Sequence, residues 1–142
     1  MARILIVEDE RIIAEDLKIS LRNFGYDIIA IVSSGEDAIK KAEELCPDLM
    51  LMDIALQGDI DGIEAAEKIH EKSDIPIVYL TAYSNGDILE KAKQTRPYAY
   101  LVKPFHENEL RTKIEIALHE HEMEPNPEKV SGHKSDYKVG SA

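Results

Sequence analysis

Short apolar runs alternate along the chain with longer segments in which apolar residues recur every third or fourth position. Apolar runs of about four to eight residues between turn signals are typical of buried strands, and the longer spacing is typical of amphipathic helices. The predicted strands cover residues 3–7, 27–32, 49–54, 75–80 and 98–102. Because the runs are apolar throughout, we expect a sheet that is buried on both faces.

Helical segments follow each of these strands, so the pattern predicts an α/β fold with a parallel sheet and helices on both of its faces. Helix boundaries are marked by turn and capping residues. The first predicted helix covers residues 11–24 and ends at Gly25, and the second is capped by Ser34 and ends before Pro47. The third opens at Asp61, with Glu64 at capping-box spacing. The fourth begins at Ser84 or Asn85 and ends before Pro97, and the fifth reaches about His121.

The length of 142 residues favours one folded domain, which we predict to span residues 1–122. From Glu124 onward Pro, Gly, Ser and Lys replace the apolar periodicity, and we predict a disordered tail or linker over residues 123–142. The net charge is −11, and the three acidic and three basic residues after Met123 cancel. The excess acid on the folded part disfavours direct binding of nucleic acid and favours metal cations and basic protein surfaces.

No apolar run approaches the roughly 18 residues of a membrane span, and the first residues read as a strand rather than a signal sequence. We therefore expect a cytoplasmic protein with no membrane partner. The single cysteine, Cys46, cannot form an internal disulfide, and its apolar helical setting predicts a small core residue.

Polar residues follow the strands at positions that a parallel sheet brings to one edge. These residues are Glu8 and Asp9 after the first strand, Asp53 at the end of the third, Thr81 after the fourth and Lys103 after the fifth. Functional groups of open α/β sheets lie at this carboxyl edge. Three clustered carboxylates repel one another unless a cation lies among them, and Mg²⁺ prefers such oxygen ligands.

An aspartate beside Mg²⁺ can attack a phosphoryl group and form an acyl phosphate. Asp53 ends a buried strand at this carboxyl edge, which is where a functional acid is expected. The Lys103 ammonium can pair with Asp53 before the reaction and with a phosphoryl oxygen after it, and the Thr81 hydroxyl can donate to another oxygen.

In this order and spacing, the motifs resemble the receiver domain of two-component response regulators, in particular its stand-alone, chemotaxis-regulator-like members. The matching motifs are Glu8-Asp9, Met52-Asp53, Thr81-Ala82 and Lys103-Pro104-Phe105. The resemblance covers residues 1 to about 122. It implies a flavodoxin-like three-layer sandwich with a five-stranded parallel sheet in the order 2-1-3-4-5 and five helices.

The same resemblance implies that a histidine kinase or phosphotransfer protein passes a phosphoryl group to Asp53. Mg²⁺ would be bound by Glu8 (largely through water), Asp9, Asp53 and the Ala55 backbone carbonyl. Thr81 would then move toward the phosphoryl group, and the aromatic ring of Tyr100 would turn inward. The surface of the fourth helix, fifth strand and fifth helix would change and be read by a downstream protein. A homodimer is also compatible with this family.

Three features depart from the commonest single-domain members. The loop from Ile54 to Asp61 is one residue longer, Tyr98 replaces a small residue after Pro97, and Ala55 and Tyr83 occupy variable positions that influence how fast the acyl phosphate hydrolyses. A ring at Tyr83 is expected to screen the site from water.

Competing functions are weighed by the residues they need. Aspartate-nucleophile phosphohydrolases resemble one another in an Asp-x-Asp motif, whose second acid acts as the general acid. Ala55 occupies that position here, so we expect a switch and not a turnover enzyme. A flavin mononucleotide site would place a phosphate where Glu8, Asp9 and Glu10 repel it. A receiver-fold interaction module that works without phosphorylation remains an alternative.

Overall fold

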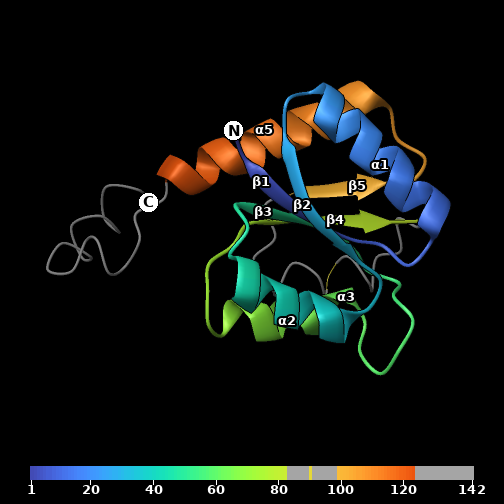
Figure 1. Cartoon of the computed structure of the whole chain (residues 1–142), viewed down its shortest axis with the longest axis vertical. Helices are drawn as coiled ribbons and strands as arrows, with labels where there is room; N and C mark the ends of the chain where they lie inside the picture. Colours follow the sequence, from blue (N-terminus) through green and yellow to red (C-terminus); the bar gives the residue numbers. More distant parts are fainter. Residues whose placement is uncertain (83–89, 91–98, 124–142) are drawn as a thin grey trace, which may run out of the picture.

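The computed structural model describes residues 1–82, 90 and 99–123. Its centre is one parallel sheet in the strand order β2-β1-β3-β4-β5 (Figure 1). The strands are β1 (Arg3–Val7), β2 (Asp27–Val32), β3 (Leu49–Asp53), β4 (Ile77–Thr81) and β5 (Ala99–Val102). The α/β class and the strand order 2-1-3-4-5 expected from the sequence are confirmed.

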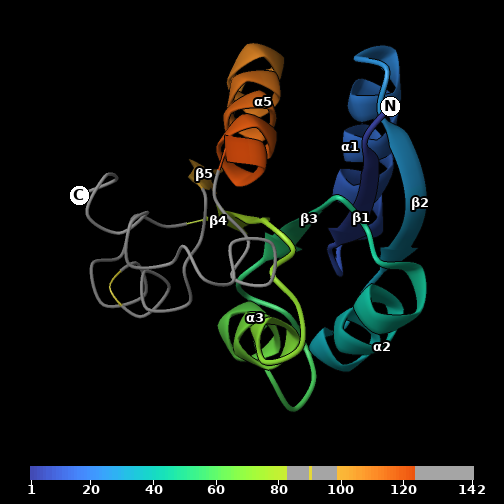
Figure 2. The ribbon, with the colours of Figure 1, turned by 90° about the vertical axis from the view of Figure 1, so that its left-hand side faces the viewer.

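Helices cover both faces of the sheet and complete the three-layer sandwich. They are α1 (Arg11–Asn23), α2 (Gly35–Leu45), α3 (Gly62–His70) and α5 (Glu107–Met123). In Figure 2, α1 and α5 lie on one side of the sheet, and α2 and α3 lie on the other. The predicted fourth helix, the screening residue Tyr83, the Pro97-Tyr98 pair and the tail after residue 123 lie outside the described residues.

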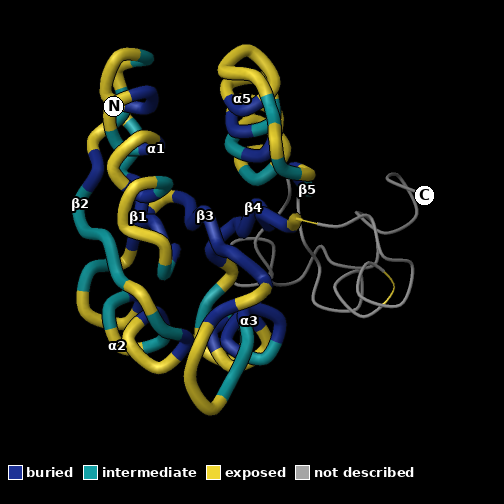
Figure 3. Tube along the Cα trace, turned by 90° about the vertical axis from the view of Figure 1, so that its right-hand side faces the viewer, coloured by how far each residue is buried: buried dark blue, intermediate teal, exposed yellow. Residues whose placement is uncertain are grey.

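The core consists of two apolar layers because alternate residues of each strand point to opposite faces. On β1, Leu5 and Val7 contact the layer under α2 and α3, whereas Ile4 and Ile6 contact the layer under α1 and α5. Every residue of β3 and β4 is buried, and these strands form the inner part of the sheet (Figure 3). The continuous apolar runs of the sequence reflect this two-sided burial.

Local boundaries follow the predicted capping residues with small shifts. Asp61 and Glu64 form the full capping box at the start of α3, with distances of 2.9 and 3.0 Å. Gly25 ends the first helix with a φ of 96°, which a residue without Cβ adopts readily. Strand β4 begins after Pro76, and α5 continues through Met123. Within residues 1–82, 90 and 99–123, no helix has the length and apolar content that a membrane crossing requires.

The expectation that Cys46 is a core residue is wrong. Cys46 is exposed and ends α2 in the left-handed region, with a φ of 47°. Its backbone N–H closes the last turn by donating to Ala42, and its carbonyl accepts from the Arg3 guanidinium at 3.0 Å. The helical periodicity extends to Leu45, and the following Pro47 requires the chain to leave the helix at Cys46.

Gly62 provides a first test of how the fold holds Asp53. Its N–H donates to the carbonyl of Ile54 at 2.9 Å, and a Cβ at this position would collide with the carbonyl oxygen of Asp53 and lie 2.9 Å from the Ile54 Cα. Helix propensity alone favours Gly→Ala by about 1 kcal/mol. We expect Gly62→Ala instead to lower the free energy of unfolding by about 2 kcal/mol or more, because backbone must move.

Urea unfolding of Gly62→Ala beside Glu67→Ala, at an exposed position of the same helix, measures this difference. A Gly62→Ala protein as stable as the parent would contradict the close packing of α3 against the end of β3.

Candidate functional site

The carboxyl edge of the sheet brings the predicted residues together because the parallel register aligns the strand ends. Val7 pairs with Met52, so Glu8 and Asp9 leave β1 beside the end of β3. Asp53 pairs with Leu80, and Thr81 pairs with Val102, so Lys103 follows directly from the end of β5. Along the carboxyl edge, the strand order therefore places the three acids of β1 and β3 first, then the Thr81 hydroxyl of β4 and the Lys103 ammonium after β5.

Glu8, Asp9 and Asp53 form a carboxylate cluster. One oxygen of each lies within 4.8 Å of the others. Glu8 and Asp53 are buried, with exposed fractions of 2% and 4%, and Asp9 is half-buried. Negative charge held this close and this far from water is unfavourable without a compensating cation.

Lys103 supplies part of that compensation. Its Nζ donates to Glu8 Oε1 at 3.0 Å and to Asp53 Oδ2 at 3.1 Å, and its backbone N–H donates to the carbonyl of Thr81 at 2.7 Å. Burial lowers the pKa of Lys103, but the hydrogen bonds and negative charges of Glu8 and Asp53 outweigh this, so its pKa lies above the ordinary value. The ammonium therefore stays charged at neutral pH.

Glu8 has the most perturbed carboxyl group among the described residues. Burial raises its pKa from 4.5 to about 7, assisted by the charge of Asp53 and opposed by hydrogen bonds from the Glu10 N–H and from Lys103. Lys103, which also pairs with Asp53, thus offsets the effect of burial on Glu8 only in part. A second cation at the cluster would favour its ionised form.

Asp53 is oriented from two sides. Its Oδ2 accepts from Lys103, and its Oδ1 accepts from the backbone N–H of Ala55 at 3.0 Å. Each carboxylate oxygen retains further lone pairs, since a carboxylate can accept about four hydrogen bonds or ligand contacts. Three carboxylates with a backbone loop beside them form the oxygen-rich donor set that suits Mg²⁺. The residues present therefore fit this ion.

Thr81 and Tyr100 lie on the neighbouring strands β4 and β5, and Tyr100 pairs with Tyr79, two residues before Thr81. Thr81 is buried at the end of β4. Tyr100 lies one strand away, and its ring is stacked on that of Tyr79 with 6.1 Å between centroids and 24° between planes. The Tyr100 hydroxyl oxygen is buried, and the described residues give it no hydrogen-bond partner. Burial, with the charge of Glu90, raises its pKa.

Gln57 makes a contact that the sequence did not predict. Its backbone N–H donates to Asp9 Oδ2 at 3.3 Å across the loop that follows β3. Backbone donors leave no mark in a pattern of residue types. The available signal was the length of the Ile54–Asp61 loop, together with the glycine at position 58.

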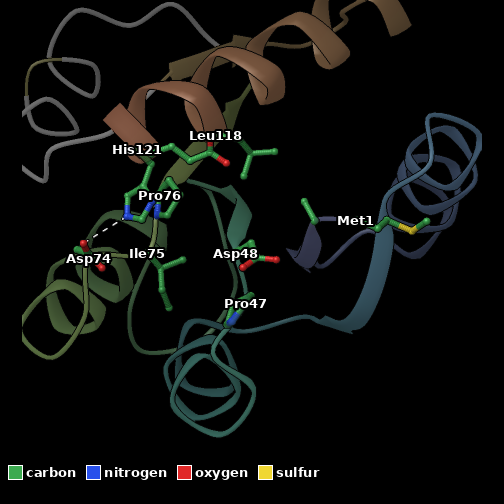
Figure 4. A pocket seen from close by; sticks show the side chains of 10 residues that line it. Met1, Pro47, Asp48, Asp74, Ile75, Pro76, Leu118 and His121 are labelled. Carbon is green, nitrogen blue, oxygen red and sulfur yellow. Dashed lines mark ion pairs between the residues drawn. The ribbon is translucent and has the colours of Figure 1, made fainter. Parts of the chain in front are cut away.

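A pocket lies at the opposite edge of the sheet, where β1, β3 and β4 begin (Figure 4). It has a volume of about 390 Å³, and one wall contains an ion pair of 3.3 Å between His121 and Asp74. The predicted site residues lie at the other end of the strands, so this pocket is separate from the carboxylate cluster.

Residues 4–115 match the family model of the response regulator receiver domain. The chain therefore belongs to this family, whose members are signalling domains of two-component systems. It is 44% identical over 116 residues to the transcriptional regulatory protein PdtaR of Mycobacterium tuberculosis. That match covers 82% of this chain and 56% of PdtaR, so the chain spans about half the length of this relative.

Solved receiver domains have the same fold. The signal receiver domain of a modulated diguanylate cyclase from Desulfovibrio desulfuricans G20 gives a TM-score of 0.83 at 36% identity, covering 88% of this chain and 99% of that one. The receiver domain of sensor histidine kinase PA1611 from Pseudomonas aeruginosa gives 0.76 at 30% identity, covering 83% and 98%. The PA1611 domain was solved with a magnesium ion coordinated in its active-site cleft.

The raised pKa of Glu8 makes the metal-free protein sensitive to pH. Its pKa of about 7 lies above the unfolded value of 4.5, so the folded state holds a proton that the unfolded state has released between these values. The contribution of Glu8 to the free energy of unfolding should then fall as pH rises from about 4.5 to 7. We expect Glu8→Gln to remove this part of the pH dependence.

Urea unfolding at several pH values in EDTA, with Glu15→Gln at an exposed position of α1 as control, provides the measurement. Identical pH profiles for Glu8→Gln and the parent would refute the assigned titration.

Proposed function

We propose that the chain is a phosphoacceptor switch in which Asp53 receives a phosphoryl group from a histidine kinase or phosphotransfer protein. The observation that carries the proposal is the setting of Asp53. Its buried carboxylate is held between Lys103 Nζ and the Ala55 N–H, with oxygens of Glu8 and Asp9 within 4.8 Å. Membership of the receiver family supports it.

In the proposed reaction, one carboxylate oxygen of Asp53 forms a bond to phosphorus while the bond between phosphorus and the donor imidazole nitrogen breaks. The imidazole leaves and retains or takes up a proton according to its pKa. The Ala55 N–H fixes Oδ1, so the carboxylate cannot rotate freely as the donor approaches. Lys103 is already within hydrogen-bond distance of Oδ2, and its ammonium group can then donate to a phosphoryl oxygen on which negative charge develops.

Glu8, Asp9, Asp53 and the Ala55 carbonyl would hold Mg²⁺, which when bound offsets the negative charge of the transferring oxygens. The close carboxylates support this assignment, and so does the raised pKa of Glu8, because burial disfavours its charged form in the absence of a further cation. The magnesium-bound PA1611 domain is a precedent in the same fold.

The switch is proposed to act through Thr81, Lys103 and Tyr100. Moving a protein from 1% to 99% of its active conformation takes about 5.5 kcal/mol. Charge-assisted hydrogen bonds from Lys103 and Thr81 to the phosphoryl group, at about 1.5–3 kcal/mol each, have the required size. Tyr100 stacks on Tyr79 in the apolar layer under α2 and α3, so a change at Thr81 on the adjacent strand can reach the surface of β5.

Partners follow from this assignment. The phosphodonor is a histidine kinase or phosphotransfer protein. Because the kinase uses ATP in the cytoplasm, we assign the chain to the same compartment. The output is a protein that reads the altered surface, and the chain itself performs no turnover of external substrates. We further propose that the domain predicted over residues 1–122 extends to the end of α5 at Met123, with the following residues serving as a tail or linker.

Asp53→Asn tests the phosphoacceptor. Asparagine keeps the shape and lacks the nucleophilic oxygen charge, so incubation with acetyl phosphate and Mg²⁺ should add one phosphoryl group to the parent protein and none to the variant. Intact-protein mass spectrometry measures the gain, which EDTA and hydroxylamine should abolish.

Asp37→Asn, an exposed change on α2, is the matched control and should be modified like the parent. A folded parent protein with bound Mg²⁺ and no mass gain would favour the alternative, a receiver-fold module that acts without phosphorylation.

Lys103→Ala tests the coupling. With beryllium fluoride as a stable phosphoryl analogue, we expect amide chemical shifts of the parent to change along β5 and α5, and those of the variant to change only near the site. Lys72→Ala, which removes an exposed lysine with an ion pair of 3.3 Å to Glu43, should respond like the parent. A full response in Lys103→Ala would show that the ammonium is not the coupling group.

A further inference from the structure

We propose that the backbone N–H of Gln57 positions Asp9 as a metal ligand, so that the loop of residues 54–61 sets the affinity of the carboxylate cluster for Mg²⁺. The inference rests on the proposed function, since it takes this cluster as the magnesium site. Gln57 acts through its main chain and touches no reacting atom; it is a positioning residue.

The three acids are held by different groups. Glu8 and Asp53 both accept from Lys103 Nζ, at 3.0 and 3.1 Å. Within the part of the chain that the structure describes, the hydrogen bond of Asp9 comes from the Gln57 N–H, at 3.3 Å to Oδ2. Asp9 is also the most exposed of the three.

Electrostatics alone would turn Asp9 away from the cluster. Its carboxylate is repelled by Asp53 and by the ionised form of Glu8, and water is accessible on its outer side. A side chain free to rotate would be recruited by the metal only at a cost in rotamer entropy. The donor at Gln57 opposes both effects, because it holds Oδ2 toward the loop that follows β3.

The donor is itself fixed by the fold on both sides of the loop. Gln57 pairs with Ser34 in an isolated parallel bridge, next to the start of α2. Gly58 follows with a φ of 112°, which turns the chain directly after the donor. The side chain of Ile60 then packs over Gly35, where a Cβ would lie 2.7 Å from Ile60 Cγ1.

This bond is compatible with metal binding. A carboxylate has about four acceptor positions, and one N–H leaves the others for a cation. Loss of such an outer contact typically weakens metal sites by about 10–100-fold. Because the Gln57 contact is long and partly exposed, we expect a smaller loss of about threefold to tenfold, in the range of one ordinary hydrogen bond.

The experiment compares Gln57→Pro, which lacks the N–H, with Gln57→Ala, which keeps it. Calorimetric Mg²⁺ titration of the full chain should give a dissociation constant about threefold to tenfold higher for the proline variant than for the alanine variant. In acetyl phosphate reactions, the Mg²⁺ concentration for half-maximal rate should rise by the same factor, while the rate at saturating Mg²⁺ stays equal.

Equal or tighter Mg²⁺ binding by Gln57→Pro would overturn the inference and leave the proposed function standing. No Mg²⁺ binding by the parent protein would overturn both. A second measurement covers a proline variant that fails to fold. Hydrogen exchange of the Gln57 amide in the metal-free parent should become faster in Asp9→Ala, and an unchanged exchange rate would equally overturn the inference.

Discussion

The site depends on one unfavourable interaction, the repulsion between carboxylates that the sheet holds at its carboxyl edge. Glu8 and Asp53 are buried and share a single ammonium, and Asp9 adds a third negative charge within 4.8 Å. The burial of these strands between the two apolar layers stabilises the fold and offsets the repulsion. The hydrophobic core thus stabilises an arrangement that its polar edge opposes, which is common where binding or chemistry requires preorganised charge.

Much of this could be predicted from the sequence. Continuous apolar strands followed by helices define a parallel sheet, and a parallel sheet brings residues at strand ends to one edge whatever their separation along the chain. The expected pairing of Lys103 with Asp53 is present at 3.1 Å, although the two residues are 50 positions apart in the sequence. The capping box at Asp61 and Glu64 could also be predicted, because its geometry is local and depends on side-chain type.

Backbone geometry explains what could not be predicted. Cys46 looked like a core residue because the helical period extends to Leu45, but the chain turns into the left-handed region one residue later. The contact of Gln57 with Asp9 depends on where a main-chain N–H points, which any residue except proline provides. Patterns of side-chain types carry no information on such donors, so a site held partly by backbone is always underestimated from sequence.

The same distinction separates two kinds of control over the site. Side-chain charges, such as that of Lys103, compensate the cluster and, in the proposed reaction, would be redistributed when a phosphoryl group arrives. Backbone donors, such as the N–H groups of Ala55 and Gln57, remain where the fold places them. A cation that binds only the folded state adds stability in proportion to RT ln(1 + [L]/Kd), about 2.7 kcal/mol at a hundredfold excess over Kd. A metal bound at the cluster would therefore relieve the repulsion and stabilise the fold together, and in the proposed arrangement the loop that orients Asp9 would set the metal concentration at which this happens.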